Sequence, residues 1–121
     1  MSVKIVIGGQ VEKKEIEALV KQYGGDAVET FVKSDLEAAV ALKTGQADYY
    51  LGACHTGGGG ALAMAIAVAG KAQCETVSMP GHPPTPEKVN AAVAKGAKAF
   101  GFTGDHKEQA VQLIMNALLH K

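Results

Sequence analysis

Arginine and tryptophan are absent from this 121-residue chain, and all twelve of its basic residues are lysines. Any phosphate site must therefore use backbone amides, lysine, histidine or hydroxyl groups instead of a bidentate guanidinium. Aromatic residues make up only 5% of the chain, and the formal net charge is zero. These values argue against a base-stacking or polyanion-binding surface, so we expect neither nucleic acid nor a membrane as a partner.

Cysteine and long hydrophobic runs are also scarce. The two cysteines, Cys54 and Cys74, are too few for a disulfide framework. The apolar run Ala61–Ala69 is too short to span a bilayer, and the N-terminus lacks the features of a secretion signal. We therefore expect a cytoplasmic protein in which residues 1–121 form a single α/β domain.

Short apolar runs alternate with helical patterns along the chain. The expected strands are Val3–Ile7, Ala27–Lys33, Ala47–Ala53, Cys74–Met79 and Lys98–Thr103. The expected helices cover residues 10–23, 35–44, 61–69 and 86–95, with a last one after Gly104-Asp105. This alternation predicts a three-layer, doubly wound sheet of five parallel strands in the flavodoxin-like order 2-1-3-4-5.

Two of the expected helices have clear start signals. Ser34 is followed three residues later by Glu37, which is the pattern of a capping box. Thr85 precedes Pro86, and proline is favoured at the first position of a helix.

The loops that follow parallel strands share one edge of the sheet, where ligands of such folds bind. Gly8 and Gly9 follow the first strand, and histidines follow the third, fourth and fifth: His55, His82 and His106. We expect these residues to contribute to a ligand site. Histidines that are merely tolerated in exposed loops are the alternative.

The stretch from Gly52 to Gly60 is the most specific feature of the chain. Backbone N–H groups and the N-terminus of the following helix would point at one spot, which suits an anion. The predicted ligand-binding residues of this stretch are Thr56, Gly57, Gly58, Gly59 and Gly60. The motif is neither a Walker loop nor a dinucleotide fingerprint, and close helix packing is the alternative reason for the glycines.

Cys54 and His55 are the candidate catalytic residues. A helix N-terminus and an adjacent histidine favour the thiolate, the form that acts as nucleophile or base. The alternative is that Cys54 is a small buried apolar residue. Cys74 starts a strand at the opposite edge, so we expect no bridge between the two cysteines and a core position for Cys74.

The run Ala61–Ala69 has no polar face. A helix that is apolar all round is buried on all sides. In a chain of this size one side can pack on the sheet, so we expect the other side to pack on a second subunit of a homo-oligomer.

Most of the chain resembles the YhfU family of small bacterial proteins. The resemblance is carried by Lys43–Tyr50, the residues Leu51–Gly57, the alanine-rich run to Gly70, and Ser34–Ala39 with Phe100-Gly101 and His106. It implies a small cytoplasmic protein and leaves the activity open.

A second resemblance is local. Cys54-x-Thr56-Gly57-x-Gly59 is similar to the C-x-T-G-x-G loop of the ribose-5-phosphate isomerase B and galactose-6-phosphate isomerase family. By that likeness Cys54 would be the base and the amides of Gly57–Gly60 an oxyanion hole. The chain departs from that family where Gly9-Gln10 replaces an Asp-His pair, and it lacks the arginines that grip the phosphate.

The leading hypothesis is a protein that binds a small anionic metabolite, such as a sugar phosphate or carboxylate, with isomerase-like chemistry as one form of it. A non-catalytic oligomeric binding or assembly subunit is the alternative. A metal protein that uses His55, His82 and His106 is a third hypothesis. We assign no cofactor and no metal.

Overall fold

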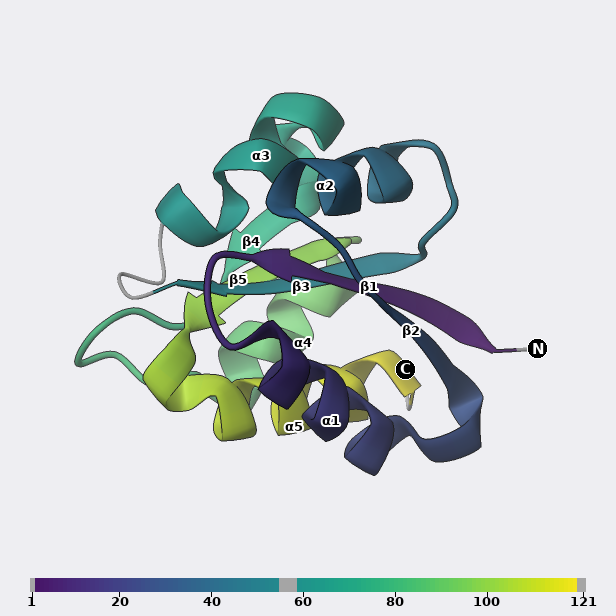
Figure 1. Cartoon of the computed structure of the whole chain (residues 1–121). Coiled ribbons are helices and arrows are strands. Elements are labelled where there is room, and N and C mark those ends of the chain that lie inside the picture. The colour runs from purple at the N-terminus through teal and green to yellow at the C-terminus, as the bar shows by residue number, and fades with distance from the viewer. Residues whose placement is uncertain (1, 55–58, 120–121) are drawn as a thin grey trace.

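The computed structural model describes residues 2–54 and 59–119, with side chains in the helix after the gap from Leu62 onward. Five parallel strands form one sheet, and helices cover both of its faces (Figure 1). The strands are β1 (Val3–Gly9), β2 (Val28–Val32), β3 (Tyr49–Cys54), β4 (Cys74–Thr76) and β5 (Ala99–Thr103). The expected α/β class with five parallel strands is therefore confirmed.

The order of the strands is β2-β1-β3-β5-β4, so the predicted order 2-1-3-4-5 is wrong for the last two strands. All five residues of β5 are buried, whereas β4 has three residues, two of them only partly buried. A fully buried strand requires neighbours on both sides, while a short polar strand suits an edge. β5 therefore takes the inner position.

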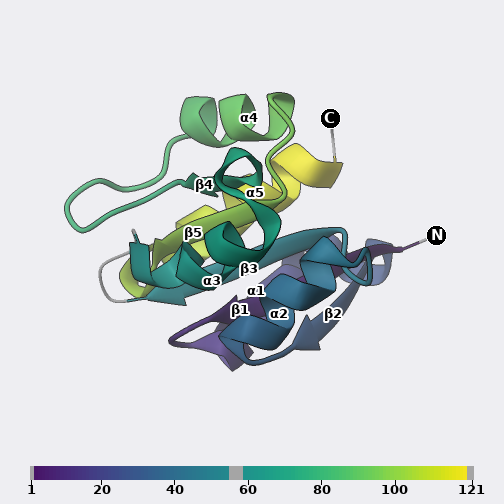
Figure 2. The ribbon, with the colours of Figure 1, turned by 90° about the horizontal axis from the view of Figure 1, so that it is seen from above.

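The helices lie in two layers (Figures 1 and 2). Their bounds are α1 (Lys13–Gly24), α2 (Asp35–Lys43), α3 (Gly59–Ala69), α4 (Pro86–Ala94) and α5 (Lys107–Leu119). The connections from β2 to β3 and from β3 to β4 cross the sheet in one direction and place α2 and α3 on one face. The connection from β4 to β5 runs back, so a right-handed crossover places α4 on the other face beside α1 and α5.

Local signals explain where several helices begin. The Ser34 hydroxyl accepts a hydrogen bond from the Glu37 N–H, and Thr85 Oγ1 accepts one from the Lys88 N–H, as caps do. Pro86 occupies the first turn of α4. Helix α1 begins at Lys13, later than expected, because Glu12 has a left-handed backbone with φ 55°.

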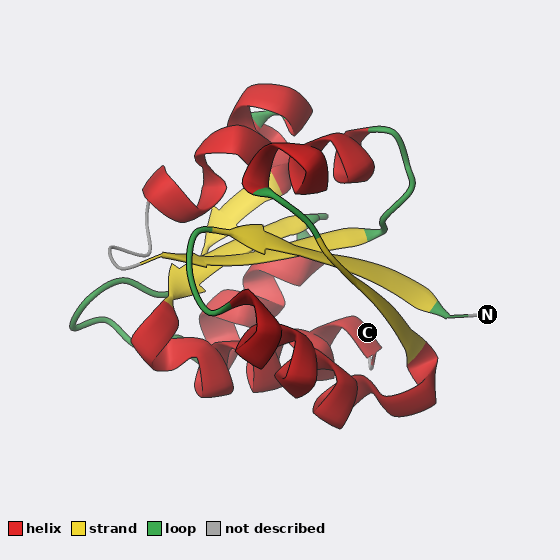
Figure 3. Cartoon of the chain, in the orientation of Figure 1, coloured by secondary structure: helices red, strands yellow, loops and turns green. Residues whose placement is uncertain are grey.

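The expected strand Cys74–Met79 is shorter than predicted. The Val77 N–H still donates to the Gly101 carbonyl, but the Thr103 N–H then donates to Ser78 Oγ instead of a backbone carbonyl, and the chain turns at Pro80-Gly81. Met79 and His82 exchange two backbone hydrogen bonds of 3.1 and 2.8 Å around Pro80-Gly81. Gly81 has φ 75°, a conformation that proline followed by glycine supplies in a tight turn. This loop projects beyond the carboxyl edge of the sheet in Figure 3.

Two apolar clusters fill the space between the layers. The cluster under α1, α4 and α5 is built from large side chains such as Ile5, Phe100 and Ile114. The cluster under α2 and α3 is built mainly from alanines, with Tyr50 as its one aromatic buried residue. Within the described residues, no helix combines the length and the apolar character needed to cross a membrane.

Candidate functional site

The carboxyl ends of β3 and β5 lie side by side. The register of the two parallel strands pairs Cys54 with Thr103, and each side chain is about 1% exposed. Paired residues of neighbouring strands are about 4.8 Å apart and face the same side of the sheet. Cys54, predicted as a catalytic residue, therefore lies next to a buried hydroxyl.

Thr103 belongs to a hydrogen-bonded group at this edge, Ser78–Thr103–His106, which we call the edge cluster. The Thr103 N–H donates to Ser78 Oγ at 3.0 Å, and the two hydroxyl oxygens are 3.3 Å apart. Thr103 Oγ1 is also 2.7 Å from His106 Nδ1. Among the residues whose burial is described, Ser78 and Thr103 are the buried polar ones, so buried polarity is concentrated here.

The edge cluster contains two hydroxyl protons, and only one arrangement lets both of them be donated to an acceptor within the cluster. Ser78 then donates to Thr103, and Thr103 donates to His106 Nδ1. A neutral imidazole that accepts at Nδ1 carries its proton on Nε2. In this ordering His106 is a hydrogen-bond donor toward a ligand.

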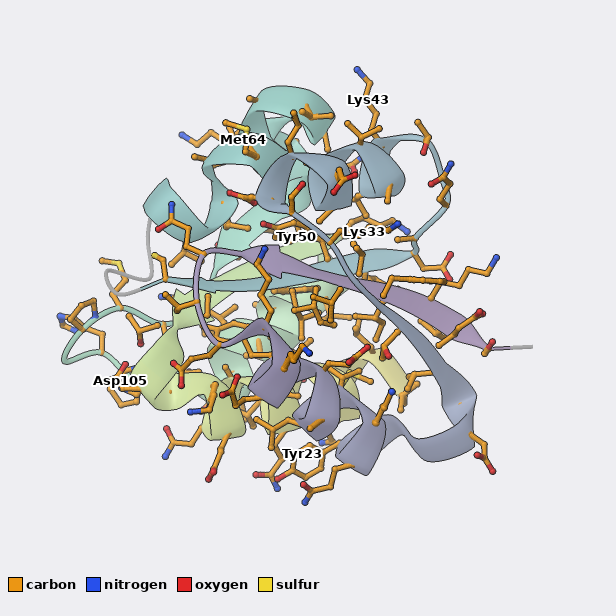
Figure 4. The ribbon with its side chains drawn as sticks, in the orientation of Figure 1. Tyr23, Lys33, Lys43, Tyr50, Met64 and Asp105 are labelled. Atoms are coloured by element: carbon orange, nitrogen blue, oxygen red, sulfur yellow. The ribbon has the colours of Figure 1, made fainter. Side chains whose placement is uncertain are left out.

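Asp105 adds a carboxylate beside the edge cluster. Its Oδ1 lies 3.8 Å from His106 Nδ1, and its side chain is exposed. The adjacent Thr103 side chain, and then the nearby His106, lower the pKa of the Asp105 carboxyl. Figure 4 shows Asp105 at the end of the molecule where β5 passes into α5.

A second polar group lies on the α2 side of the same edge. The Tyr50 hydroxyl donates to Asp35 Oδ1 at 2.5 Å and accepts the Gly9 N–H at 2.9 Å. Burial and then the Asp35 carboxylate raise the pKa of Tyr50. Tyr50 therefore ties the start of α2 to the end of β1 as a neutral phenol.

Glycines make room for the Tyr50 ring. Gly8, Gly52 and Gly101 are neighbours across β1, β3 and β5. A Cβ on Gly8 would lie 2.6 Å from the Tyr50 ring and 2.8 Å from Ala38 Cβ, and one on Gly52 would lie 2.9 Å from the ring. Gly9 has φ 76°, and a Cβ there would lie 2.6 Å from the Ala53 backbone nitrogen. Gly8 and Gly9 thus have a structural reason for being glycine, and their predicted ligand role stays a prediction.

Opposite α2, a hollow of about 370 Å³ opens at this edge. It is lined by Glu12, Pro80, Gly104, Asp105 and Lys107. Lys107 Nζ is 2.8 Å from Glu12 Oε1, and that carboxylate raises the pKa of the lysine. Because two carboxylates and one paired lysine line the hollow, it does not by itself attract an anion.

The other predicted site residues are placed as follows. Gly59 and Gly60 open α3, and His82 is exposed in the turn with Met79. His55, Thr56, Gly57 and Gly58 lie outside the described residues. Among the residues that are described, no three His, Cys, Asp or Glu side chains form a group that could hold a metal ion.

Sequence reasoning did not select four polar residues of this edge: Ser78, Thr103, Tyr50 and Asp35. Ser78 follows the apolar residue Val77 near the end of the expected strand Cys74–Met79. A polar residue at the carboxyl end of a strand could have been selected as a candidate site residue on that ground. The partnership of Tyr50 with Asp35 spans 15 residues and depends on how α2 packs, so no local pattern indicates it. Cys74 is buried, as expected, and burial raises the pKa of its thiol.

Comparisons with known proteins give relatives but no activity. The family described as "Protein of unknown function DUF2620" matches residues 3–118. The uncharacterized protein YhfU of Escherichia coli K12 is 37% identical over 115 residues, which cover 95% of this chain and 97% of that protein. The YhfU protein of Shigella flexneri has the same identity and coverage. No solved structure matches the chain significantly.

Proposed function

Since the chain belongs to the DUF2620 family, whose function is unknown, we propose from its own geometry that it binds a small anionic metabolite at the carboxyl edge of β3 and β5. The observation that carries the proposal is the edge cluster beside Cys54. The chain of buried Ser78 and Thr103 with partly buried His106 lies at the edge where parallel sheets bind ligands, and such a chain is costly to maintain unless every member has a partner. Here each member does.

The start of α3 supports an anion as the ligand. Helix α3 has 11 residues and begins at Gly59, five positions along the chain from Cys54, the last residue of β3. The first N–H groups of a helix have no partner within the helix and carry a partial positive charge. Together with a donor on His106, they would bind one oxyanion group.

The charges at this edge limit the ligand. The chain has no arginine, and Lys107 is already paired with Glu12. A polyphosphate would therefore lack countercharge, whereas a carboxylate or a sugar monophosphate needs only a few backbone amides and neutral donors.

Proton transfer is a second candidate function, favoured by the position of Cys54 next to Thr103. The thiol would act as the base, and His106, oriented by Thr103, would donate to the developing oxyanion. An aldose–ketose isomerisation fits these two groups: the Cys54 thiolate would take a proton from one carbon and return it to the neighbouring carbon, and His106 would pass a proton between the two substrate oxygens.

The test is a thermal-shift and NMR titration with ribose 5-phosphate, inorganic phosphate and citrate, with ribose as the uncharged control. We expect the anions to raise Tm and ribose not to. Thr103→Val, which keeps the shape and removes the hydroxyl, and His106→Gln should weaken binding, whereas His82→Gln should not. The absence of any Tm rise or chemical-shift change with all three anions would contradict the proposal.

Cys54→Ser separates the two candidates. A binding protein keeps its affinity for the anion after this substitution, while an isomerase loses turnover of the sugar phosphate and keeps affinity. If the unmodified protein binds ribose 5-phosphate but exchanges no substrate proton with deuterated water, the proton-transfer candidate is wrong.

A further inference from the structure

A carboxylate, Asp35, lies on the α2 side of the edge that holds the proposed anion site. It is the first residue of α2 and is partly buried. The phenol of the fully buried Tyr50 donates to Asp35 Oδ1 at 2.5 Å, and the Gly9 N–H makes a longer contact of 3.4 Å with the same oxygen. Within the described residues Oδ2 makes no hydrogen bond, and no buried side-chain oxygen there lacks a partner, so Oδ2 faces solvent.

Asp35 differs from the other carboxylates of this edge in having no basic partner. Glu12 is 2.8 Å from Lys107, and Asp105 lies beside His106, whereas none of the ion pairs among the described residues includes Asp35. The contacts to Oδ1 hold the carboxylate in place without neutralising it. A fixed carboxylate beside an anion site repels a ligand that brings only negative charge.

The hydrogen bond between Tyr50 and Asp35 lies on the same side of the sheet as Cys54. Side chains alternate along a strand, and Tyr50 packs in the cluster under α2 and α3, so Cys54, four residues later, faces that layer too. Figure 4 shows Tyr50 between the sheet and α2. A Cβ on Gly52 would lie 3.0 Å from the Tyr50 hydroxyl oxygen, and Cys54 is the next residue of this face, about 7 Å farther along the strand. Asp35 and Thr103 therefore lie on opposite sides of Cys54, toward β1 and β5.

We propose that Asp35 makes this site selective for polyhydroxylated anions, such as sugar monophosphates and sugar acids, because Oδ2 accepts hydrogen bonds from the hydroxyl groups of the ligand. This selectivity rests on the proposed function and narrows its ligand class. Hydrogen bonds from a hydroxyl to a carboxylate are charge-assisted and about twice as strong as neutral ones, so they offset the repulsion between the two negative charges. An anion without hydroxyl groups forms no such bond and is still repelled.

Isothermal titration calorimetry with two matched pairs of probes measures the selectivity. Ribose 5-phosphate is compared with methyl phosphate, and gluconate with acetate, so that each pair shares its anionic group. For the unmodified chain we expect the hydroxylated member of at least one pair to bind at least about tenfold more tightly. The pair that shows this preference identifies the anionic group as a phosphate or a carboxylate.

Asp35→Asn tests the residue itself, because it keeps an oxygen that accepts from Tyr50 and removes the charge. It should weaken binding of the hydroxylated probe about tenfold and leave the other probe of the pair unchanged or more tightly bound. A merely structural role would weaken both probes alike. Glu37→Gln removes the same charge from the first turn of α2 at an exposed position and is the matched control, which should keep the ratio of the two Kd values.

The outcomes distinguish this selectivity from the proposed function. Equal Kd values within both pairs for the unmodified chain would overturn the selectivity and leave anion binding intact. An Asp35→Asn variant that keeps the preference, or that weakens both members of a pair equally, would overturn it as well. If none of the four probes binds, the proposed function fails and the selectivity fails with it. The comparison in the unmodified chain requires no variant, so it decides even if Asp35→Asn does not fold.

Discussion

The two helical layers cover the same sheet with different side chains. In the lower layer of Figure 1, α1, α4 and α5 bury large residues, among them Ile16, Val89 and Ile114, and carry charged residues on the outside. In the upper layer, α2 and α3 bury mostly alanine, and α3 has no charged residue. Small side chains let α2 and α3 approach the sheet closely, and Tyr50 fits under them only because its neighbours on the strands are glycines.

This difference separates two tasks. The lower layer supplies the larger share of apolar burial, which is the main stabilising term in folding. The upper layer contributes to the carboxyl edge. Asp35 of α2 bonds to the Tyr50 hydroxyl of β3, and α3 has its N-terminus at the predicted anion site. We therefore expect the lower layer to be sensitive to lost volume and the upper layer to be sensitive to added volume.

Ile114→Ala should have the largest effect on stability. Ile114 is fully buried in the lower cluster, and removing its side chain leaves a cavity. Truncations of this kind lower the free energy of unfolding by about 2–5 kcal/mol. Urea denaturation measures the loss. Gln112→Ala, at an exposed position on the same helix, is the control and should stay within about 0.5 kcal/mol of the unmodified protein.

Gly8→Ala should have the next largest effect, through added volume in the upper layer. The new methyl group would press on the Tyr50 ring and on Ala38, and such overpacking costs about 1–3 kcal/mol. The same denaturation experiment measures it. In a Tyr50→Val background the ring is gone, so the cost of Gly8→Ala should fall. An unchanged cost would show that the ring does not restrict this position.

Tyr50→Phe should have the smallest effect, about 1–2 kcal/mol, although it removes only one oxygen atom. The Asp35 carboxylate loses the phenol as its donor, and the Gly9 N–H keeps only its longer contact of 3.4 Å with Asp35 Oδ1, so both groups are less well satisfied. Tyr49→Phe, on the opposite face of β3, is the matched comparison. The difference between the losses of unfolding free energy in the two variants shows how much of the effect comes from the hydrogen bond between Tyr50 and Asp35.

The pH dependence of stability checks the same bridge. Burial and Asp35 raise the pKa of Tyr50 in the folded protein above its value of about 10 in the unfolded chain. Above pH 10 the unfolded chain loses this proton first, so the stabilisation present below pH 10 is lost as the pH rises. The slope is about 1.4 kcal/mol per pH unit for one group. Tyr50→Phe should remove this part of the alkaline loss; identical slopes for both proteins would contradict it.

Part of the fold could be predicted from the sequence because its signals are local. Alternating apolar runs and helix caps at Ser34 and Thr85 indicated five strand–helix units, and parallel strands bring their loops to one edge. Cys54 and His106 were placed at that edge correctly. The start of β4 at Cys74 was also predicted correctly, but its end was not, because the Thr103 N–H meets the Ser78 hydroxyl instead of continuing the strand pairing, and no propensity scale includes such a contact.

The candidate site also has one part that the sequence indicated and one part that depends on tertiary contacts. His106 was visible as a histidine after a strand, but its contact with Thr103 requires the turn at the start of α5. Ser78 meets Thr103 across 25 residues of chain because β4 lies beside β5. Such a contact depends on which strands are neighbours, which is decided by burial in the finished sheet.

The sequence by itself determined the class of fold, the parallel direction of the strands and the edge where β3 and β5 end, since periodicity and caps act over a few residues. Only the tertiary structure decided that β5 lies inside and β4 at the edge, because all of β5 is apolar enough to be buried on both sides. That choice moved α4 to the lower layer and left α2 and α3 as a two-helix layer with an apolar outer face. It also brought Ser78 to Thr103, next to Cys54.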